Sequence, residues 1–171
     1  MARRVEEITI DLNVFVDGVS FLGVATGFKP PSIEMVGVES ESSSAGKINL
    51  YYGAFENFEA EFSLAVQDEV LYNEMKKCNE GSLLFKQSIS TGELCQTKII
   101  SYELSGQISG LEENEVKRGE KISTTAKMGS CWYYKKMING KVVFEVDKKQ
   151  GISKPDGKID SLAQARNNVA S

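Results

Sequence analysis

The side chains best suited to chemistry lie at the end of a strand-like segment, where Glu145 and Asp147 are followed by Lys149. A metal-dependent nuclease uses these residue types, because carboxylates bind a divalent cation and a lysine stabilises developing negative charge. Such a site needs another carboxylate from an upstream strand, and no Pro-Asp pair precedes Glu145. We therefore favour the alternative interpretation, a solvated strand end.

The absence of histidine excludes several kinds of catalytic site. Without an imidazole the chain has no Ser-His-Asp or Cys-His arrangement, no His-ligated zinc and no imidazole switch near neutral pH. The cysteines Cys78, Cys95 and Cys131 are widely separated and form no C-x-x-C pair. This spacing favours three reduced, buried thiols over a disulfide, metal or catalytic role.

Two binding motifs are incomplete. Around Gly46-Lys47, Glu41 stands where a phosphate-binding loop needs glycine, and Ile48 stands where it needs serine or threonine. Asp156-Gly157 near Asp160 lacks the regularly spaced oxygen ligands of a calcium loop and is better explained as a turn. We therefore expect no catalytic residue, no bound metal and no cofactor.

The charge balance argues against a tight, sequence-independent grip on nucleic acid. The chain carries 20 Lys and Arg against 24 Asp and Glu, a formal net charge of −4, whereas such binding needs a basic surface. Trp132, Tyr133 and Tyr134 are able to stack on bases, but aromatic residues in a strand more often pack in a core.

Length and composition indicate one soluble globular domain spanning residues 1–171. The chain is 41% apolar and 26% charged, and its 171 residues are enough for one core but hardly for two. No apolar run approaches the 18 residues of a spanning helix, so we expect no membrane anchor. Residues 1–7 turn acidic where a signal peptide needs an apolar core, which predicts a protein that stays in the cytoplasm where it is made.

Strand signals dominate the chain. Asp17-Gly18 and Asn139-Gly140 each separate two apolar-rich runs, which predicts two tight hairpins. Residues 58–66 alternate strictly, with an apolar face and a polar face that carries Glu59 and Glu61. Further extended segments are expected at 33–38, 48–52, 82–90, 95–108 and 121–134. Residues 109–119 are expected to form an acidic loop and 148–157 an irregular segment.

Two short helices complete the predicted elements. Residues 69–78 switch to helical spacing, with Leu71, Met75 and Cys78 as the apolar stripe. A closing helix over 160–170 begins with a Ser161–Gln164 capping box. A helix this short is marginal alone in water, so it must dock on something.

The fold class that follows is mainly β: an antiparallel β-barrel or sandwich with one interior helix and a short C-terminal helix. No internal repeat or linker divides the chain. The Ser/Glu-rich run 39–47 is the most polar stretch, and we expect an exposed loop there.

Three segments carry a resemblance to a known family. Residues 13–24 read NVFVDGVSFLGV, residues 133–147 run from an aromatic pair through Asn-Gly to Glu-Val-Asp, and residues 160–169 read DSLAQARNNV. In this order they resemble the opening hairpin, the late aromatic strand and the closing segment of the major tail tube proteins of contractile-tailed phages and R-type tailocins. Two departures, the Ser/Glu-rich run 39–46 and the Ala170-Ser171 ending, fall where such subunits contact one another.

The resemblance implies a structural, non-enzymatic β-barrel subunit of the tail-tube type. Such subunits form homohexameric rings that stack into a hollow tube, which sheath contraction drives through the target envelope and which then conducts DNA. The implied partners are other copies of the chain, the tail sheath protein, the baseplate and tail terminator proteins, and the tape measure protein and DNA in the lumen. The implied location is a virion or tailocin particle assembled in the cytoplasm of the bacterial host.

The resemblance also assigns candidate contact residues. A hairpin or loop at 39–52 is expected to reach the neighbouring ring, with the candidates Glu41, Ser42, Ser43, Ser44, Lys47 and Tyr51. The acidic face with Glu59 and Glu61 is a candidate lumen lining, and an outer or subunit-facing surface is the alternative. The closing helix offers Leu162, Arg166 and Val169 as subunit-interface candidates.

Three other functions remain open from the sequence. A tailocin tube or the tube of a type VI-like secretion system shares the expected fold. A metal-dependent nuclease using Glu145, Asp147 and Lys149, or a small β-barrel binding module, belongs to a different class.

Overall fold

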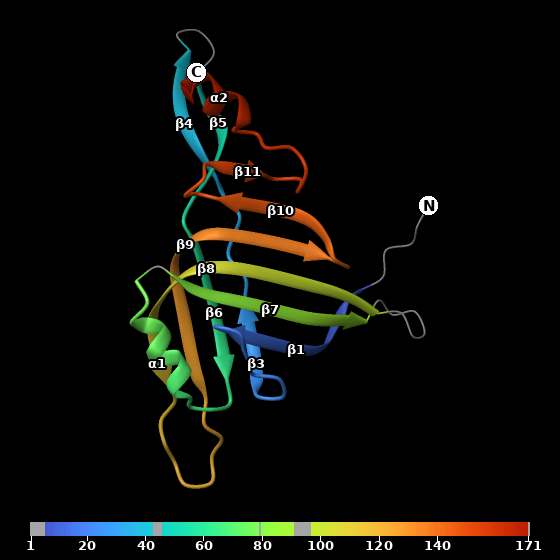
Figure 1. Cartoon of the computed structure of the whole chain (residues 1–171), viewed down its shortest axis with the longest axis vertical. Helices are drawn as coiled ribbons and strands as arrows, with labels where there is room; N and C mark the ends of the chain where they lie inside the picture. The colour runs from blue at the N-terminus through green and yellow to red at the C-terminus, as the bar shows by residue number, and fades with distance from the viewer. Residues whose placement is uncertain (1–5, 43–45, 79, 91–96, 171) are drawn as a thin grey trace.

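A computed structural model describes residues 6–42, 46–78, 80–90 and 97–170 and shows a mainly β molecule (Figure 1). In chain order the elements are β1 (Ile8–Val16), β2 (Val19–Ser20), β3 (Ala25–Lys29), β4 (Met35–Ser42), β5 (Gly46–Phe55), β6 (Phe58–Leu64), α1 (Glu69–Met75), β7 (Gly81–Ser90), β8 (Thr97–Glu113), β9 (Thr124–Ile138), β10 (Lys141–Asp147), β11 (Ile152–Lys154) and α2 (Ala163–Ala170). The described strand pairs are antiparallel, so the predicted mainly β antiparallel fold with two short helices is confirmed.

The long strands β8 and β9 belong to two layers. One layer runs in the order β11-β10-β9-β8-β7-β1-β2, and in the other β6 pairs with β3 and with the first half of β9. Figure 1 shows β3 and β6 crossing behind the strands of the first layer. Within the described residues the sheet does not close into a barrel, so the molecule is a sandwich whose two layers share a pair of bent strands.

The bend depends on a close approach between β8 and β9. The pairing register shifts between Ser105 and Gln107, and Ser130 has a positive φ of 50°. A Cβ added to Gly106 would lie 2.9 Å from the Cα of Cys131. Only glycine fits at this crossing, because any side chain would push the two strands apart.

The core fills the space between the two layers. Phe58, Ala60, Phe62 and Leu64 are all buried, which confirms the alternation predicted for 58–66. Aromatic rings dominate the centre: Phe28 stacks on Phe85 at 4.0 Å between centroids. The two predicted hairpin turns are also confirmed, since Asp17-Gly18 and Asn139-Gly140 have the positive φ values that a type I′ turn requires.

Helix α1 differs from its prediction in the side that it buries. It ends at Met75, and it buries Leu71 and Glu74 while Met75 and Cys78 are exposed. The Glu74 carboxylate is tolerated there because Lys77 Nζ lies 2.6 Å from it. The predicted burial of three thiols is therefore wrong for Cys78 and right for Cys131, and Cys95 lies outside the described residues.

Four boundaries also differ from the sequence prediction. β8 continues to Glu113, so part of the expected acidic loop is strand, because β9 pairs with it as far as Thr124. β11 occupies part of the segment expected to be irregular, where β10 supplies its hydrogen-bonding partner. α2 begins at Ala163 rather than at 160, and most of the predicted loop 39–47 is strand. No helix among the described residues is long and apolar enough to cross a membrane.

Candidate functional site

The β4–β5 hairpin is a separate two-stranded sheet that projects beyond the β11 border of the large sheet (Figure 1). β4 and β5 pair from Met35 opposite Phe55 to Ser42 opposite Gly46. Only the base of the hairpin is tied into the core, where the Phe55 ring lies edge-on to Phe144 at 5.2 Å. Beside it, the Gly53 carbonyl accepts the Ser153 hydroxyl at 2.7 Å. From Gly46 to Tyr52 the residues of β5 are exposed, so the outer part of the hairpin is left uncovered.

The two faces of the hairpin differ sharply in chemistry. Val38 lies opposite Leu50, and Ser40 lies opposite Ile48, so that these residues share one face. Tyr52 continues the same alternation along β5. The large apolar side chains of this face, which are Val38, Ile48, Leu50 and Tyr52, are 53–54% exposed. We call this surface the apolar face of the hairpin.

The opposite surface is polar. Lys47 Nζ lies 2.9 Å from Glu39 and 3.2 Å from Glu41, and these contacts raise the pKa of Lys47 above its ordinary value. Tyr51 lies over Gly37, where an added Cβ would come within 3.1 Å of its ring. We call this surface the polar face of the hairpin.

The structure places the predicted contact residues unevenly on this hairpin. Glu41, Lys47 and Tyr51 lie on the polar face, Ser42 ends β4, and Ser43 and Ser44 lie outside the described residues. The sequence analysis did not single out the apolar face. The period-two spacing of Ile48, Leu50 and Tyr52 was the signal that could have found it.

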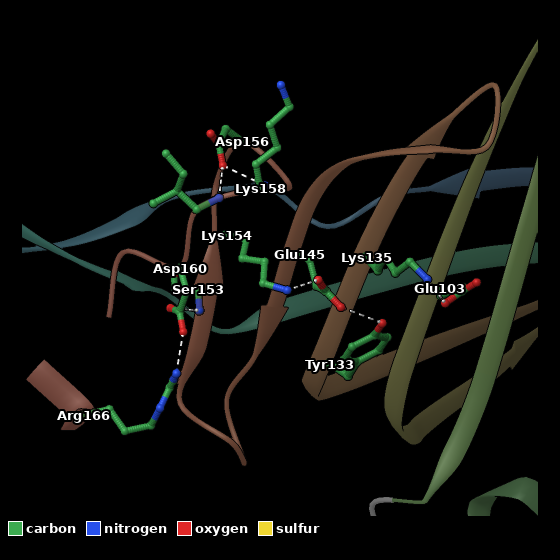
Figure 2. Close-up of polar contacts among 11 residues, drawn as sticks. Glu103, Tyr133, Lys135, Glu145, Ser153, Lys154, Asp156, Lys158, Asp160 and Arg166 are labelled. Atoms are coloured by element: carbon green, nitrogen blue, oxygen red, sulfur yellow. Dashed lines mark hydrogen bonds and ion pairs between the residues drawn. The ribbon is translucent and has the colours of Figure 1, made fainter. Parts of the chain in front are cut away.

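Residues 160–161 fasten the chain after β11 to the edge of that strand (Figure 2). Asp160 accepts hydrogen bonds from the Ser153 N–H at 3.0 Å and from Arg166 Nη2 at 2.8 Å. Burial works to raise the pKa of Asp160, but the bonds from Ser153, Arg166 and Leu162 together hold it below its ordinary value. Ser161 donates its N–H to the Ser153 carbonyl at 2.7 Å.

The three interface candidates of the closing segment therefore have different surroundings. Leu162 is half-buried beside Gly53, and Arg166 also donates to the Gly151 carbonyl at 2.9 Å, so both hold the segment to its own subunit. Val169 is 88% exposed, and α2 buries none of its residues. Of the three, Val169 is the side chain that is presented outward.

The candidate nuclease residues are engaged within the subunit. Glu145 lies in a row of alternating charge across four strands, from Glu103 through Lys135 and Glu145 to Lys154 (Figure 2). Lys154 Nζ is 3.1 Å from Glu145, and Lys135 Nζ is 3.2 Å from Glu103. Tyr133, two residues before Lys135 on β9, donates to Glu145 at 3.4 Å, and burial, followed by the charge of Glu145, raises its pKa to about 12.

Asp147 and Lys149 do not complete a metal site either. Asp147 is nearly buried and accepts the Gln150 N–H at 3.0 Å, which shapes the turn after β10. Lys149 Nζ lies 4.0 Å from the centre of the Trp132 ring. Among the described residues no three His, Cys, Asp or Glu side chains are placed to hold a metal ion.

Glu59 and Glu61 lie on the outer face of the second layer, as the alternation of β6 predicts. Lys29 and Lys127 stand opposite Glu61 on the two neighbouring strands. Lys127 Nζ also lies 2.5 Å from Glu112, and this contact raises the pKa of Lys127. The acidic residues of this face are thus interleaved with lysines rather than clustered.

Large exposed apolar patches mark contact sites, so the apolar face of the hairpin is a candidate contact surface. Residues 6–169 match the family model of the phage tail tube protein FII, and the chain belongs to that family of structural tail tube proteins.

Solved structures agree at the level of the fold. The chain is similar to the tube-terminating cap of the anti-feeding prophage, with a TM-score of 0.59 at 11% identity, over 81% of this chain and 93% of that one. It is also similar to the sheath/tube terminator of an extracellular contractile injection system, PVC, in its extended state. That match has a TM-score of 0.52 at 8% identity and covers 71% of this chain and 89% of the other. No curated protein matches the sequence.

Proposed function

We propose that this chain is the subunit of the inner tube of a contractile tail, in which six copies form a ring and the rings stack into a hollow conduit for DNA. Membership of the tail tube family and the resemblance to tube terminators support this role. In the assembled particle the tube would lie inside the sheath protein, between baseplate and terminator, and would enclose the tape measure protein before DNA. The particle is a virion or a tailocin assembled in the host cytoplasm.

The uncovered hairpin is the single observation that carries the proposal. A two-stranded ribbon is marginally stable in water, and this one exposes about half of each large side chain on its apolar face. Burying such a face in a neighbouring ring would order the hairpin and hold two rings together. The polar face, with Glu41, Lys47 and Tyr51, would then lie at the rim of that contact, and we propose the same for Ser42, Ser43 and Ser44.

Glu59 and Glu61 are proposed to line the lumen. Acidic side chains interleaved with Lys29 and Lys127 offer no cluster of cations that would trap phosphates, which suits a passage for DNA. With Cys78 and Cys95 replaced by serine, a Glu59→Cys thiol in assembled tubes would react with a small maleimide but not with a bulky polymer-linked one. Equal reaction with both reagents would place this face outside.

The closing helix is proposed to contribute to contacts between subunits through Val169, because that side chain is the one left uncovered. Leu162 and Arg166 would act indirectly, by fixing where α2 leaves the sandwich.

The test compares two substitutions on adjacent residues of β5. Leu50→Asp puts a carboxylate on the apolar face, and Asn49→Asp puts the same charge on the polar face. Since burying one leucine contributes about 2 kcal/mol, repeated in every subunit, we expect Leu50→Asp to abolish tubes and Asn49→Asp to keep them. Electron micrographs and sedimentation of the purified protein provide the measurement. Wild-type protein that forms neither rings nor tubes would contradict the proposed function.

A further inference from the structure

The two borders of the layer β11-β10-β9-β8-β7-β1-β2 differ in whether their outward backbone groups are bonded. At the β11 border, Asp160 and Ser161 occupy the outward N–H and carbonyl of Ser153, at 3.0 and 2.7 Å. Farther along this border, Gly157 lies so close to β10 that an added Cβ would be 2.4 Å from the Val142 carbonyl oxygen. The chain's own segment 157–161 therefore covers this border at Ser153 and at Val142, where a strand from another molecule would otherwise pair.

The β1 border is open over residues 8–12. β2 pairs only with Phe15 and Val16, and the next backbone bond on that side runs from the Phe21 N–H to the Val14 carbonyl. N-terminal to this point, no described strand pairs with the outer side of β1. The Leu12 N–H is bound by the carboxylate of its own neighbour Asp11 at 2.8 Å, in an exposed position.

The open stretch also exposes apolar side chains. Ile8 is 69% exposed and Ile10 is 61% exposed. An edge strand with unpaired backbone groups and uncovered isoleucines is a template for adding another strand. The Asp11 carboxylate accepts the hydrogen bond of one edge donor, the Leu12 N–H, which a docking strand would otherwise bind.

The β4–β5 hairpin has the properties of the missing strand. β4 and β5 pair only with each other, so each has one outer edge free among the described residues. At roughly 3.3 Å per residue, β4 is about 26 Å long and exceeds the open stretch of β1. The two glutamates and one lysine of the polar face give it an acidic excess. Lys86, exposed on β7 opposite Asn13, offers the matching cation.

We propose that the edge of β1 at Ile8–Leu12 accepts an outer strand of the β4–β5 hairpin from a second copy of this chain. The hairpin of the same subunit projects past the opposite border of the sheet, so it does not reach β1 (Figure 1). Main-chain hydrogen bonds would supply affinity, and the apolar face of the hairpin would be covered together with Ile8 and Ile10. This inference rests on the proposed tube function and names the surface that receives the hairpin.

A contact of this kind joins two different surfaces. Each copy presents a hairpin at one end and an acceptor edge at the other, and such head-to-tail contacts continue into an open polymer rather than closing into a pair. Stacked rings require this property of the contact between one ring and the next.

Leu12→Pro tests the inference on the backbone itself. The substitution removes the N–H that faces away from β7, and an edge strand tolerates proline where that N–H is not used by the sheet. Leu12→Ala removes the side chain and keeps the N–H, and it is the matched control. We expect Leu12→Pro to fold but to need about tenfold or more protein for tube assembly, with Leu12→Ala close to wild type. Tubes of Leu12→Pro at the wild-type concentration would overturn the inference.

Cross-linking gives a second readout that does not depend on the folding of the proline variant. One variant carries both Ile10→Cys and Ser40→Cys, and its Cys78 and Cys95 are replaced by serine. Assembled tubes of this variant are treated with a short bismaleimide. We expect a ladder of covalent multimers, and we expect none when Lys158→Cys, on the covered border, replaces Ile10→Cys. If the wild type forms tubes but tubes of the Ile10→Cys, Ser40→Cys variant give no ladder, this contact alone is refuted. If the wild type forms no tubes, the proposed function is refuted.

Discussion

The sandwich and the β4–β5 hairpin share the same alternation of apolar and polar residues, but the apolar residues have different surroundings in the two regions. In β6 the apolar residues of the pattern face the core and are buried, whereas in β5 the apolar residues from Ile48 to Tyr52 face water. The difference lies in what each strand meets, since β6 is paired on both edges and β5 on one. Period-two alternation therefore marks a face that must be covered, and the covering surface can belong to the same chain or to another one.

The largest expected effect is a difference between the two regions in how much a substitution lowers the free energy of unfolding. Phe62→Ala should destabilise the subunit by about 3–5 kcal/mol, because a fully buried ring is replaced by a cavity. Leu50→Ala should change the stability of the isolated subunit by at most about 0.5 kcal/mol, since its side chain already lies in water. Urea unfolding below the assembly concentration measures both. Similar losses for the two variants would mean that the hairpin packs on its own subunit.

A smaller effect is expected at the covered border and depends on pH. The pKa of Asp160 is lowered in the folded protein, so the stability it supplies is complete above its unfolded pKa of about 3.9. That stability is lost as the pH falls through the folded value. The amide resonance of Ser153, followed by NMR during acidification, should shift in that range and should lose the response in Asp160→Asn. A response that persists in the variant would show that another group holds the border.

The smallest effect concerns the two described thiols. Burial raises the pKa of Cys131 to about 12, and the residue is fully covered, whereas Cys78 is exposed. In a Cys95→Ser background at pH 8, one thiol should react quickly with a disulfide reagent, and the second should react only on unfolding. Cys78→Ser should remove the fast reaction. Fast reaction of both thiols would show that the crossing of β8 and β9 opens readily.

The elements that the sequence predicted well are those fixed by local chemistry. Asp17-Gly18 and Asn139-Gly140 must form tight turns because their residues tolerate positive φ, and both do. The strict alternation of β6 needs no knowledge of its neighbours to place one face in a core. The family resemblance rested on such segments, and residues 6–169 bear it out.

The elements that the sequence predicted poorly depend on distant partners. The Ser/Glu-rich run was expected to be a loop because it buries nothing, yet pairing with residues 46–49 and the ion pairs of Lys47 make much of it strand. Lys77, which pairs with the buried Glu74, also lies 2.6 Å from Asp17 in the first hairpin turn, and helical spacing does not reveal this second contact. The contact candidates of the hairpin were assigned from the family resemblance to residues of the segment 39–52, and the exposure of its apolar face became visible only once the surroundings of the hairpin were known.

The segment that fastens onto β11 has a consequence for how the molecule is made. Translation proceeds from the N-terminus, so Gly157, Asp160 and Ser161 leave the ribosome after every strand that they cover. Until they emerge, the β11 border of the growing chain is unprotected in addition to the β1 border. Chains interrupted shortly after β11 would thus be prone to pair with other strands at both borders, and release of the following residues would leave the β1 border as the site that we propose for addition.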